Sequence, residues 1–113
     1  MVVMMEDVVD QELSAALRVH YKACYDYRWD AARRRGEPVP SVAGRFLAEV
    51  SAERGPALLA SIAALIGEAR RVPDPGGPLG AYGDALSRWA ATHPEIDPRE
   101  MHWITTTLMT EHR

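Results

Sequence analysis

The sequence contains one cysteine, Cys24, and no long hydrophobic run. A single cysteine cannot form a disulfide within the chain, so the framework of many small secreted domains is excluded. The longest apolar run, "PALLASIAALIG" at 56–67, is shorter than the roughly 20 residues that cross a bilayer. The opening "MVVMM" is too short for the apolar core of a signal peptide. We therefore expect a cytoplasmic protein with no membrane partner.

Lysine is also scarce, since Lys22 is the only lysine among 13 basic residues. Together with abundant alanine, glycine and proline, this arginine bias is typical of a bacterial protein from a GC-rich genome. The formal net charge of -3 argues against a broad basic face that neutralises nucleic-acid phosphates. We therefore do not expect a nucleic-acid partner.

Motifs for common enzyme and cofactor chemistry are missing. The chain has no G-x-x-x-x-G-K-[ST], no G-x-G-x-x-G and no H-E-x-x-H. The glycine-rich stretch "PDPGGPLG" lies between proline breaks and follows no strand, so it does not predict a phosphate loop. No convergent set of polar groups marks a catalytic site. The sequence favours a non-enzymatic protein without catalytic residues, cofactor or bound metal, and a small enzyme is the less favoured alternative.

The chain does show helical periodicity. Apolar residues make up 47% of it and recur every three or four residues in segments separated by glycine and proline. We predict an all-α fold, a compact single-domain bundle over residues 1–113 with about five helices and a long N-terminal one. The expected helices cover 8–34, 41–54, 56–71, 79–92 and 97–112, with a loop at 72–78 and disorder expected at 1–6.

Two of these helices carry specific expectations. The helix over 56–71 has the most continuous apolar face and is predicted to lie at the centre of the bundle. The last helix contains Thr105, Thr106 and Thr107, whose β-branched side chains lose freedom in a helix. A terminal strand is the alternative for this segment, but no partner strand is evident elsewhere, so a helix is favoured.

The stretch "HYKACYDYRW" at 20–29 is the most distinctive in the chain. At helical spacing it separates into one group that continues the core stripe of the first helix and a second group on a different side. The core-stripe group is His20, Cys24 and Tyr27. The second group, here called the aromatic stripe, is Tyr21, Tyr25 and Trp29, with Arg18, Lys22 and Arg28 beside it.

We interpret the aromatic stripe as a contact surface. Tyrosine and tryptophan supply large contact areas with a polar group, and with arginine they dominate binding hot spots. The sequence thus predicts a small protein-interaction module that binds a protein partner or a second copy of itself, as a homodimer. Arginines at the rim would select an acidic surface. The alternative is that the long first helix packs on two sides and the fourth or fifth helix covers the stripe.

The core-stripe group supports a different function, a small-molecule or metal pocket between helices. His20 and Cys24 stand one helical turn apart, close enough to share a metal ion or to form a thiolate–imidazolium pair. No further ligand with paired spacing and no third orienting group is evident, so a structural role in the core is favoured. The residues that would line such a pocket are His20, Cys24, Tyr27, Tyr82, Trp89, Met101 and His102.

Overall fold

The computed structural model describes residues 9–111, which form six α-helices and no strand. The predicted all-α bundle is confirmed, with one short helix more than expected. None of these helices is both long enough and apolar enough to cross a membrane. The disorder expected at 1–6 lies outside the described residues. The helices are α1 (Gln11–Arg28), α2 (Ala31–Arg34), α3 (Val42–Glu49), α4 (Gly55–Arg70), α5 (Leu79–Ala90) and α6 (Pro98–Glu111).

The predicted long first helix is two helices in the structure. α1 ends before Asp30, whose Oδ1 accepts hydrogen bonds from the N–H groups of Ala32 at 2.8 Å and Arg33 at 3.3 Å. Asp30 therefore caps α2, and because a capping residue has extended rather than helical backbone, the preceding helix stops there. The break leaves Trp29 at the C-terminal end of α1, while Asp10 caps the N-terminal end.

The second helix also ends earlier than the predicted residue 54. α3 stops at Glu49 because Val50 is extended, with ψ of 164°. A Cβ atom at Gly55 would lie 2.9 Å from Cδ2 of Leu47 and 3.0 Å from Cγ2 of Val50, so the tight turn into α4 requires a residue without a side chain. Pro56 follows in the first turn of α4, where its missing N–H costs no helical hydrogen bond.

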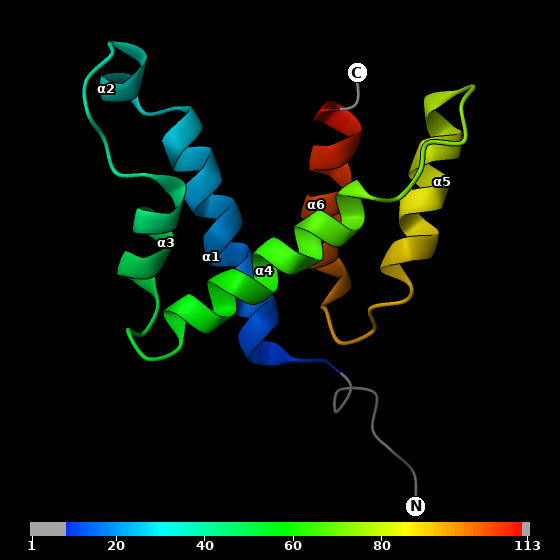
Figure 1. Ribbon diagram of the computed structural model, residues 1–113, viewed down its shortest axis with the longest axis horizontal. Helices are drawn as coiled ribbons and strands as arrows, with labels where there is room; N and C mark the ends of the chain where they lie inside the picture. The colour runs from blue at the N-terminus through cyan, green and yellow to red at the C-terminus, as the bar shows by residue number, and fades with distance from the viewer. Residues whose placement is uncertain (1–8, 112–113) are drawn as a thin grey trace, which may run out of the picture.

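α4 crosses the molecule diagonally and contacts α1, α3 and α6, which is the central position predicted for it (Figure 1). α3 packs beside α1 at one end of α4, and α5 packs beside α6 at the other. The molecule measures 51 × 43 × 18 Å. Since a helix with its side chains is about 10 Å across, the fold is a flat layer about two helices thick.

One hydrophobic core connects the helices. Its three largest fully buried side chains are Phe46 of α3, Ile62 of α4 and Leu86 of α5, so the core extends through the whole layer. Most helices contribute only a few buried residues because each has one side on the core and another in water. The remaining buried apolar residues are Ala16, Leu17, Ala23, Leu58, Leu65, Ala69, Tyr82, Ile96, Met101, Ile104 and Leu108.

α6 is a helix in spite of its threonine run. The Oγ1 of Thr105 donates a hydrogen bond to the carbonyl of His102 at 3.2 Å, and the Oγ1 of Thr110 donates to the carbonyl of Thr106 at 3.0 Å. These hydroxyls are satisfied by the preceding turn of their own helix. The predicted terminal helix is therefore confirmed, and the strand alternative is wrong.

Candidate binding groove

α1 and α6 run in the same direction and are close together where α6 begins (Figure 1). There the Arg18 guanidinium binds the Glu100 carboxylate, with 2.8 Å between Nη2 and Oε1. One turn further along both helices, the rings of Tyr21 and Trp103 stack, with centroids 4.3 Å apart and 21° between their planes. Beyond this stack the two helices diverge, so their C-terminal halves stand apart.

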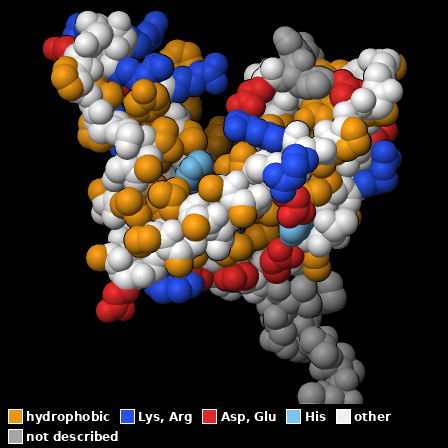
Figure 2. Space-filling model, in the orientation of Figure 1, with side chains coloured by type: hydrophobic (Ala, Val, Ile, Leu, Met, Phe, Trp, Pro, Cys, Tyr) orange, Lys and Arg blue, Asp and Glu red, His pale blue; other side chains and the backbone are white. Residues whose placement is uncertain are grey.

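The divergence leaves a groove of about 770 Å³ between α1, α4 and α6, here called the α1–α6 groove. Figure 2 shows a notch between the two arms of the molecule, with hydrophobic side chains inside it. α4 lines the groove with Ala63, Ile66 and Gly67, whose small or aliphatic side chains keep it open. α6 lines it mainly with uncharged residues, among them Thr107 and Thr110, and its two lining carboxylates, Glu100 and Glu111, are paired with Arg18 and Arg70. The groove is thus mostly apolar between its rims.

The structure divides the aromatic stripe of α1. Tyr21 is half-buried because Trp103 of the last helix covers it. Tyr25 and Trp29 are 55% and 54% exposed, and Trp103 is 39% exposed. All four rings line the α1–α6 groove. Only the first residue of the stripe is therefore covered by another helix, and three large rings remain open to solvent around the groove.

Two arginines stand over the Trp29 ring at the open end of the groove, and a third stands over Tyr27, which does not line the groove. The guanidinium carbons of Arg28 and Arg34 lie 5.6 and 5.8 Å from the centroid of the Trp29 ring. That of Arg33 lies 4.5 Å from the centroid of the Tyr27 ring. Each contact is within the range of a cation–π interaction. Among the described residues, none of the three arginines forms an ion pair.

The other basic residues predicted beside the stripe hold carboxylates of this chain. Lys22 pairs with Asp26, one turn away, at 2.7 Å and does not line the groove. Arg18 is occupied by Glu100. Of the three basic residues that the sequence placed at this surface, Arg28 alone lines the groove and has no ion-pair partner within residues 9–111.

Glu100 is buried at the end of the groove where α1 and α6 meet, and it is 3% exposed. Its Oε1 accepts two hydrogen bonds from Arg18, from Nε at 3.0 Å and from Nη2 at 2.8 Å. Its Oε2 is also buried and has no hydrogen-bond partner within residues 9–111. A buried carboxylate is destabilising unless it is hydrogen-bonded or paired with a positive charge. Arg18 supplies both to Glu100 and so offsets the cost of burying its charge.

His20 and Cys24 lie on the α1 side of the same groove, with Sγ 3.8 Å from Nδ1. Burial lowers the pKa of His20. Burial also raises the pKa of the Cys24 thiol, and the nearby negative charge of Glu111 raises it further. Both shifts favour the neutral forms, which disfavours a thiolate–imidazolium pair. The imidazole also packs edge-on against Phe46, with centroids 5.9 Å apart.

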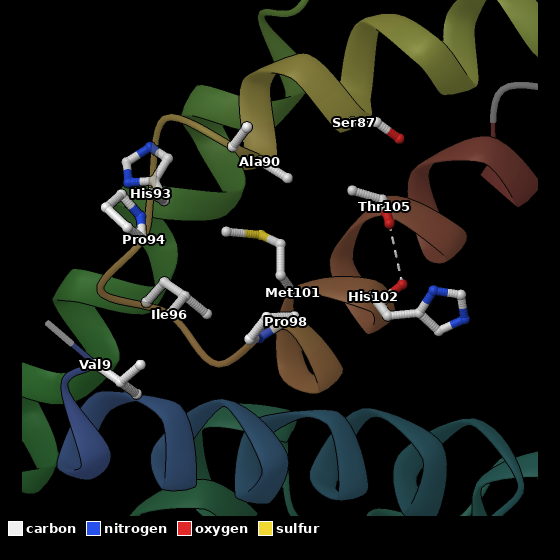
Figure 3. A pocket seen from close by; sticks show the side chains of 11 residues that line it. Val9, Ser87, Ala90, His93, Pro94, Ile96, Pro98, Met101, His102 and Thr105 are labelled. Atoms are coloured by element: carbon white, nitrogen blue, oxygen red, sulfur yellow. Dashed lines mark hydrogen bonds between the residues drawn. The ribbon is translucent and has the colours of Figure 1, made fainter. Parts of the chain in front are cut away.

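The predicted pocket set is not gathered in one place. A second hollow, of about 660 Å³, lies between α5 and α6 (Figure 3). The side chain of Met101 points into it, whereas the imidazole of His102 points away from the other lining side chains. Tyr27, Tyr82 and Trp89 line neither hollow. Among the described residues, no three His, Cys, Asp or Glu side chains are close enough together to hold a metal ion.

His93 at the edge of the second hollow bridges two carboxylates. Its Nε2 lies 2.6 Å from Oε1 of Glu68, and its Nδ1 lies 2.8 Å from Oε2 of Glu95. Burial opposes the charged imidazolium, but the hydrogen bonds that its ring N–H groups donate to the carboxylates of Glu95 and Glu68, together with their negative charges, outweigh burial and raise the pKa of His93. The same cluster lowers the pKa of Glu68, which also accepts a hydrogen bond from Trp89 Nε1 at 2.9 Å. The cluster ties α4 to the end of α5.

Replacing His93 with glutamine is expected to reduce stability in a pH-dependent way. Because the folded-state pKa of His93 is raised, its contribution is complete below the unfolded value of about 6.5 and disappears as the pH rises through the folded value. The contribution of Glu68, whose pKa is lowered, is present above its unfolded value of about 4.3 and disappears at lower pH. Urea unfolding of both proteins from pH 4 to 9 measures the difference. A difference that is constant, or grows towards pH 9, contradicts the assignment.

Several groove residues were not found from the sequence. Trp103 does not lie at the helical spacing of the buried apolar residues of α6, which are Met101, Ile104 and Leu108. This difference in spacing was the one sequence signal that Trp103 faces the groove and not the core. Thr107 and Thr110 carried no signal, because only the position of α6 relative to α1 makes them part of a wall. Glu100 was evident only as an acidic residue in a first helical turn. The sequence does not indicate that α1 packs against α6, and the groove residues can be identified only once that packing is known.

Comparison with known proteins identifies no relative of this chain. No protein-family model matches the sequence, and no curated protein and no solved structure is significantly similar to it.

Proposed function

We propose that this protein is a small non-enzymatic interaction module that receives a helix of a protein partner, or of a second copy, in the α1–α6 groove. The observation that carries the proposal is the exposure of Tyr25 and Trp29, each more than half open to solvent beside a mostly apolar groove. Tyrosine, tryptophan and arginine are the residues that dominate interface hot spots. All three types occur together at the open end of this groove.

The shape of the groove favours a helical occupant. Two walls formed by diverging helices and a floor formed by a third are the setting in which an amphipathic helix lays its apolar face. The large aromatic side chains bury 150–250 Å² each, so covering the exposed halves of Tyr25 and Trp29 would remove about 200 Å² from water. At about 25 cal/mol per Å², this burial contributes on the order of 5 kcal/mol before the cost of association.

Changing Trp29 to glutamate is expected to weaken association by about 30-fold or more, which corresponds to the loss of an interface hot spot of about 2 kcal/mol. The fold should be retained, because the Trp29 side chain is largely exposed and the new carboxylate would lie near Arg28 and Arg34. Leu47→Glu is the matched control, since Leu47 is an exposed apolar residue outside the groove.

Native mass spectrometry of each variant, purified from the cells that naturally express the protein, measures this effect, with circular dichroism as a check on folding. The wild type and Leu47→Glu should carry a second copy or a partner protein, and Trp29→Glu should not. Equal occupancy in all three proteins would argue against the groove as the contact surface. Unfolding of Trp29→Glu would show that the ring is part of the core.

The volume of the groove favours one alternative function, binding of a small molecule. Ligand pockets typically occupy about 300–1,000 Å³, and the groove also contains His20, Cys24 and the buried carboxylate of Glu100. In the same mass spectra, this alternative would show a small-molecule mass on the wild type. The double variant His20→Ala/Cys24→Ala should lose that mass and keep any protein partner. Retention of the small molecule in the double variant would contradict the alternative.

A further inference from the structure

We infer that the occupant of the α1–α6 groove is an acidic amphipathic helix of another protein rather than a second copy of this chain. The inference rests on the proposed function and specifies the chemistry of the partner. Its evidence is the distribution of charge around the groove: at the open end, arginines have no carboxylate partner among the described residues.

Within the described residues, positive charge without an ionic partner lies at the open end of the groove, on Arg28 in the lining and on Arg34 over the Trp29 ring, with Arg33 next to Arg34 in α2. Arg28, Arg33 and Arg34 form no ion pair among the described residues, although the chain as a whole has a net charge of -3. The three arginines rest on aromatic rings, which hold guanidinium groups in place without neutralising them. A partner with carboxylates at matching positions would supply the missing charge.

The carboxylates closest in sequence to these arginines are already occupied. Asp26 binds Lys22 at 2.7 Å, Asp30 binds Arg45 at 2.6 Å, and the Glu37 carboxylate binds Arg35 at 2.6 Å. The Asp30 carboxylate additionally caps α2. None of the three can turn to the groove without giving up an existing partner. The positive charge at the open end is therefore a property of the folded chain.

The carboxylates of the opposite wall, Glu100 and Glu111, are both paired with arginines of this chain. At the open end of α6, Glu111 is paired with Arg70 of α4 at 3.4 Å, and the neighbouring lining residues Thr107 and Thr110 are uncharged. The floor is mostly apolar, with Ile66 between small residues, and its one charged lining residue from α4 is the Arg70 that pairs with Glu111. The groove thus offers an apolar surface bordered on the α1 side by arginines. Its complement is a helix with an apolar stripe and carboxylates along one edge of that stripe.

A second copy does not supply this complement. In a two-fold dimer centred on Trp29, Arg28 and Arg34 of one chain would meet the same residues of the other, and like charges brought together oppose association. A head-to-tail contact would need an acidic helix edge on the far side of the chain. Within residues 9–111, the carboxylates without a basic partner include Glu49 of α3, Glu53 of the turn between α3 and α4, and Asp84 of α5, so no helix presents two of these three in a row.

The test is a selection from two matched phage-displayed libraries of helical 16-residue peptides against the immobilised full chain. Both libraries share the same apolar positions, and the flanking positions are Glu or Asp in one library and Lys or Arg in the other. The acidic library should yield the binders. Their affinity for Arg34→Glu should fall about tenfold and should fall less than about twofold for Arg88→Glu, as measured by isothermal titration calorimetry. Arg88 is a matched control because it lies in the last turn of α5, outside the groove.

Several results would overturn the inference. Selection of binders only from the basic library, or equal affinity for the two charge variants, would show that the arginines do not choose the occupant. Arg34-dependent binding of a 20-nucleotide oligo-dT that exceeds binding of the acidic peptides would assign the arginines to phosphate. A dimer of the wild type in sedimentation equilibrium that is lost in Trp29→Glu would overturn the inference and leave the proposed function standing. If the wild type is a monomer and selects no peptide from either library, both the inference and the proposed function are wrong.

Discussion

Replacing Phe46 with alanine is expected to lower the free energy of unfolding by about 3 to 5 kcal/mol. Phe46 is the only buried residue of α3, a helix of eight residues, and its exposed fraction is 0%. Its ring packs against His20 of α1. A flat layer cannot collapse easily around the cavity left by a missing ring, because the neighbouring helices are held in place by their other contacts.

Leu47→Ala is the control for this change, since Leu47 lies next to Phe46 on the same helix and is 40% exposed. Its loss of stability should stay below about 1.5 kcal/mol because little buried surface is removed. Urea unfolding followed by circular dichroism compares the two variants. A domain of this size is stabilised by about 5–15 kcal/mol in total, so Phe46→Ala should lose a large share of it. Similar losses in the two variants would mean that α3 contributes little to the core.

Replacing Arg18 with methionine is expected to cost about 2 to 3 kcal/mol, because it leaves the Glu100 carboxylate buried without a partner. The side chain of Arg18 is 63% exposed while that of Glu100 is 4% exposed. The loss therefore comes from the buried acid and not from the arginine, which water solvates well. The double variant Arg18→Met/Glu100→Met should recover most of the stability, because two apolar groups of similar size replace the pair.

The ion pair of Arg54 with Glu12 is the matched control. It also joins residues far apart in the sequence, with 2.8 Å between Nη2 and Oε1, but both of its side chains are about half exposed. Exposed pairs of this kind contribute about 0–1 kcal/mol, so Arg54→Met should change stability very little. Chemical unfolding at neutral pH measures all three variants. If Arg18→Met costs no more than Arg54→Met, the Glu100 carboxylate does not depend on Arg18.

The all-α fold was predictable from the sequence because apolar spacing and proline or glycine breaks act locally. The start of α4 at Gly55-Pro56 is an example. The end of α1 was missed because Asp30 sits in a continuous helical pattern, and its role as a cap depends on its own backbone conformation. Ala23 was missed as a core residue because alanine carries a weak hydrophobic signal and α1 contacts three helices, so more than one of its faces is covered.

The aromatic stripe of α1 was predictable as a surface distinct from the core, because its spacing of four residues is a local property. That Tyr21 would be covered and Tyr25 left exposed was not predictable. This difference depends on where α6 approaches α1 and where it diverges, which is decided by contacts between residues about 80 positions apart. The role of each stripe residue is therefore a tertiary property, and one sequence contains no local pattern for it.

The distribution of the three tryptophans gives the protein an intrinsic optical reporter. Trp29 and Trp103 line the α1–α6 groove, whereas Trp89 lies apart from it with its Nε1 hydrogen-bonded to Glu68. An occupant that removes water from the first two rings would shift their emission to shorter wavelengths, and the third would contribute a steady background. The occupancy of the groove can therefore be followed by ultraviolet fluorescence of the unlabelled chain.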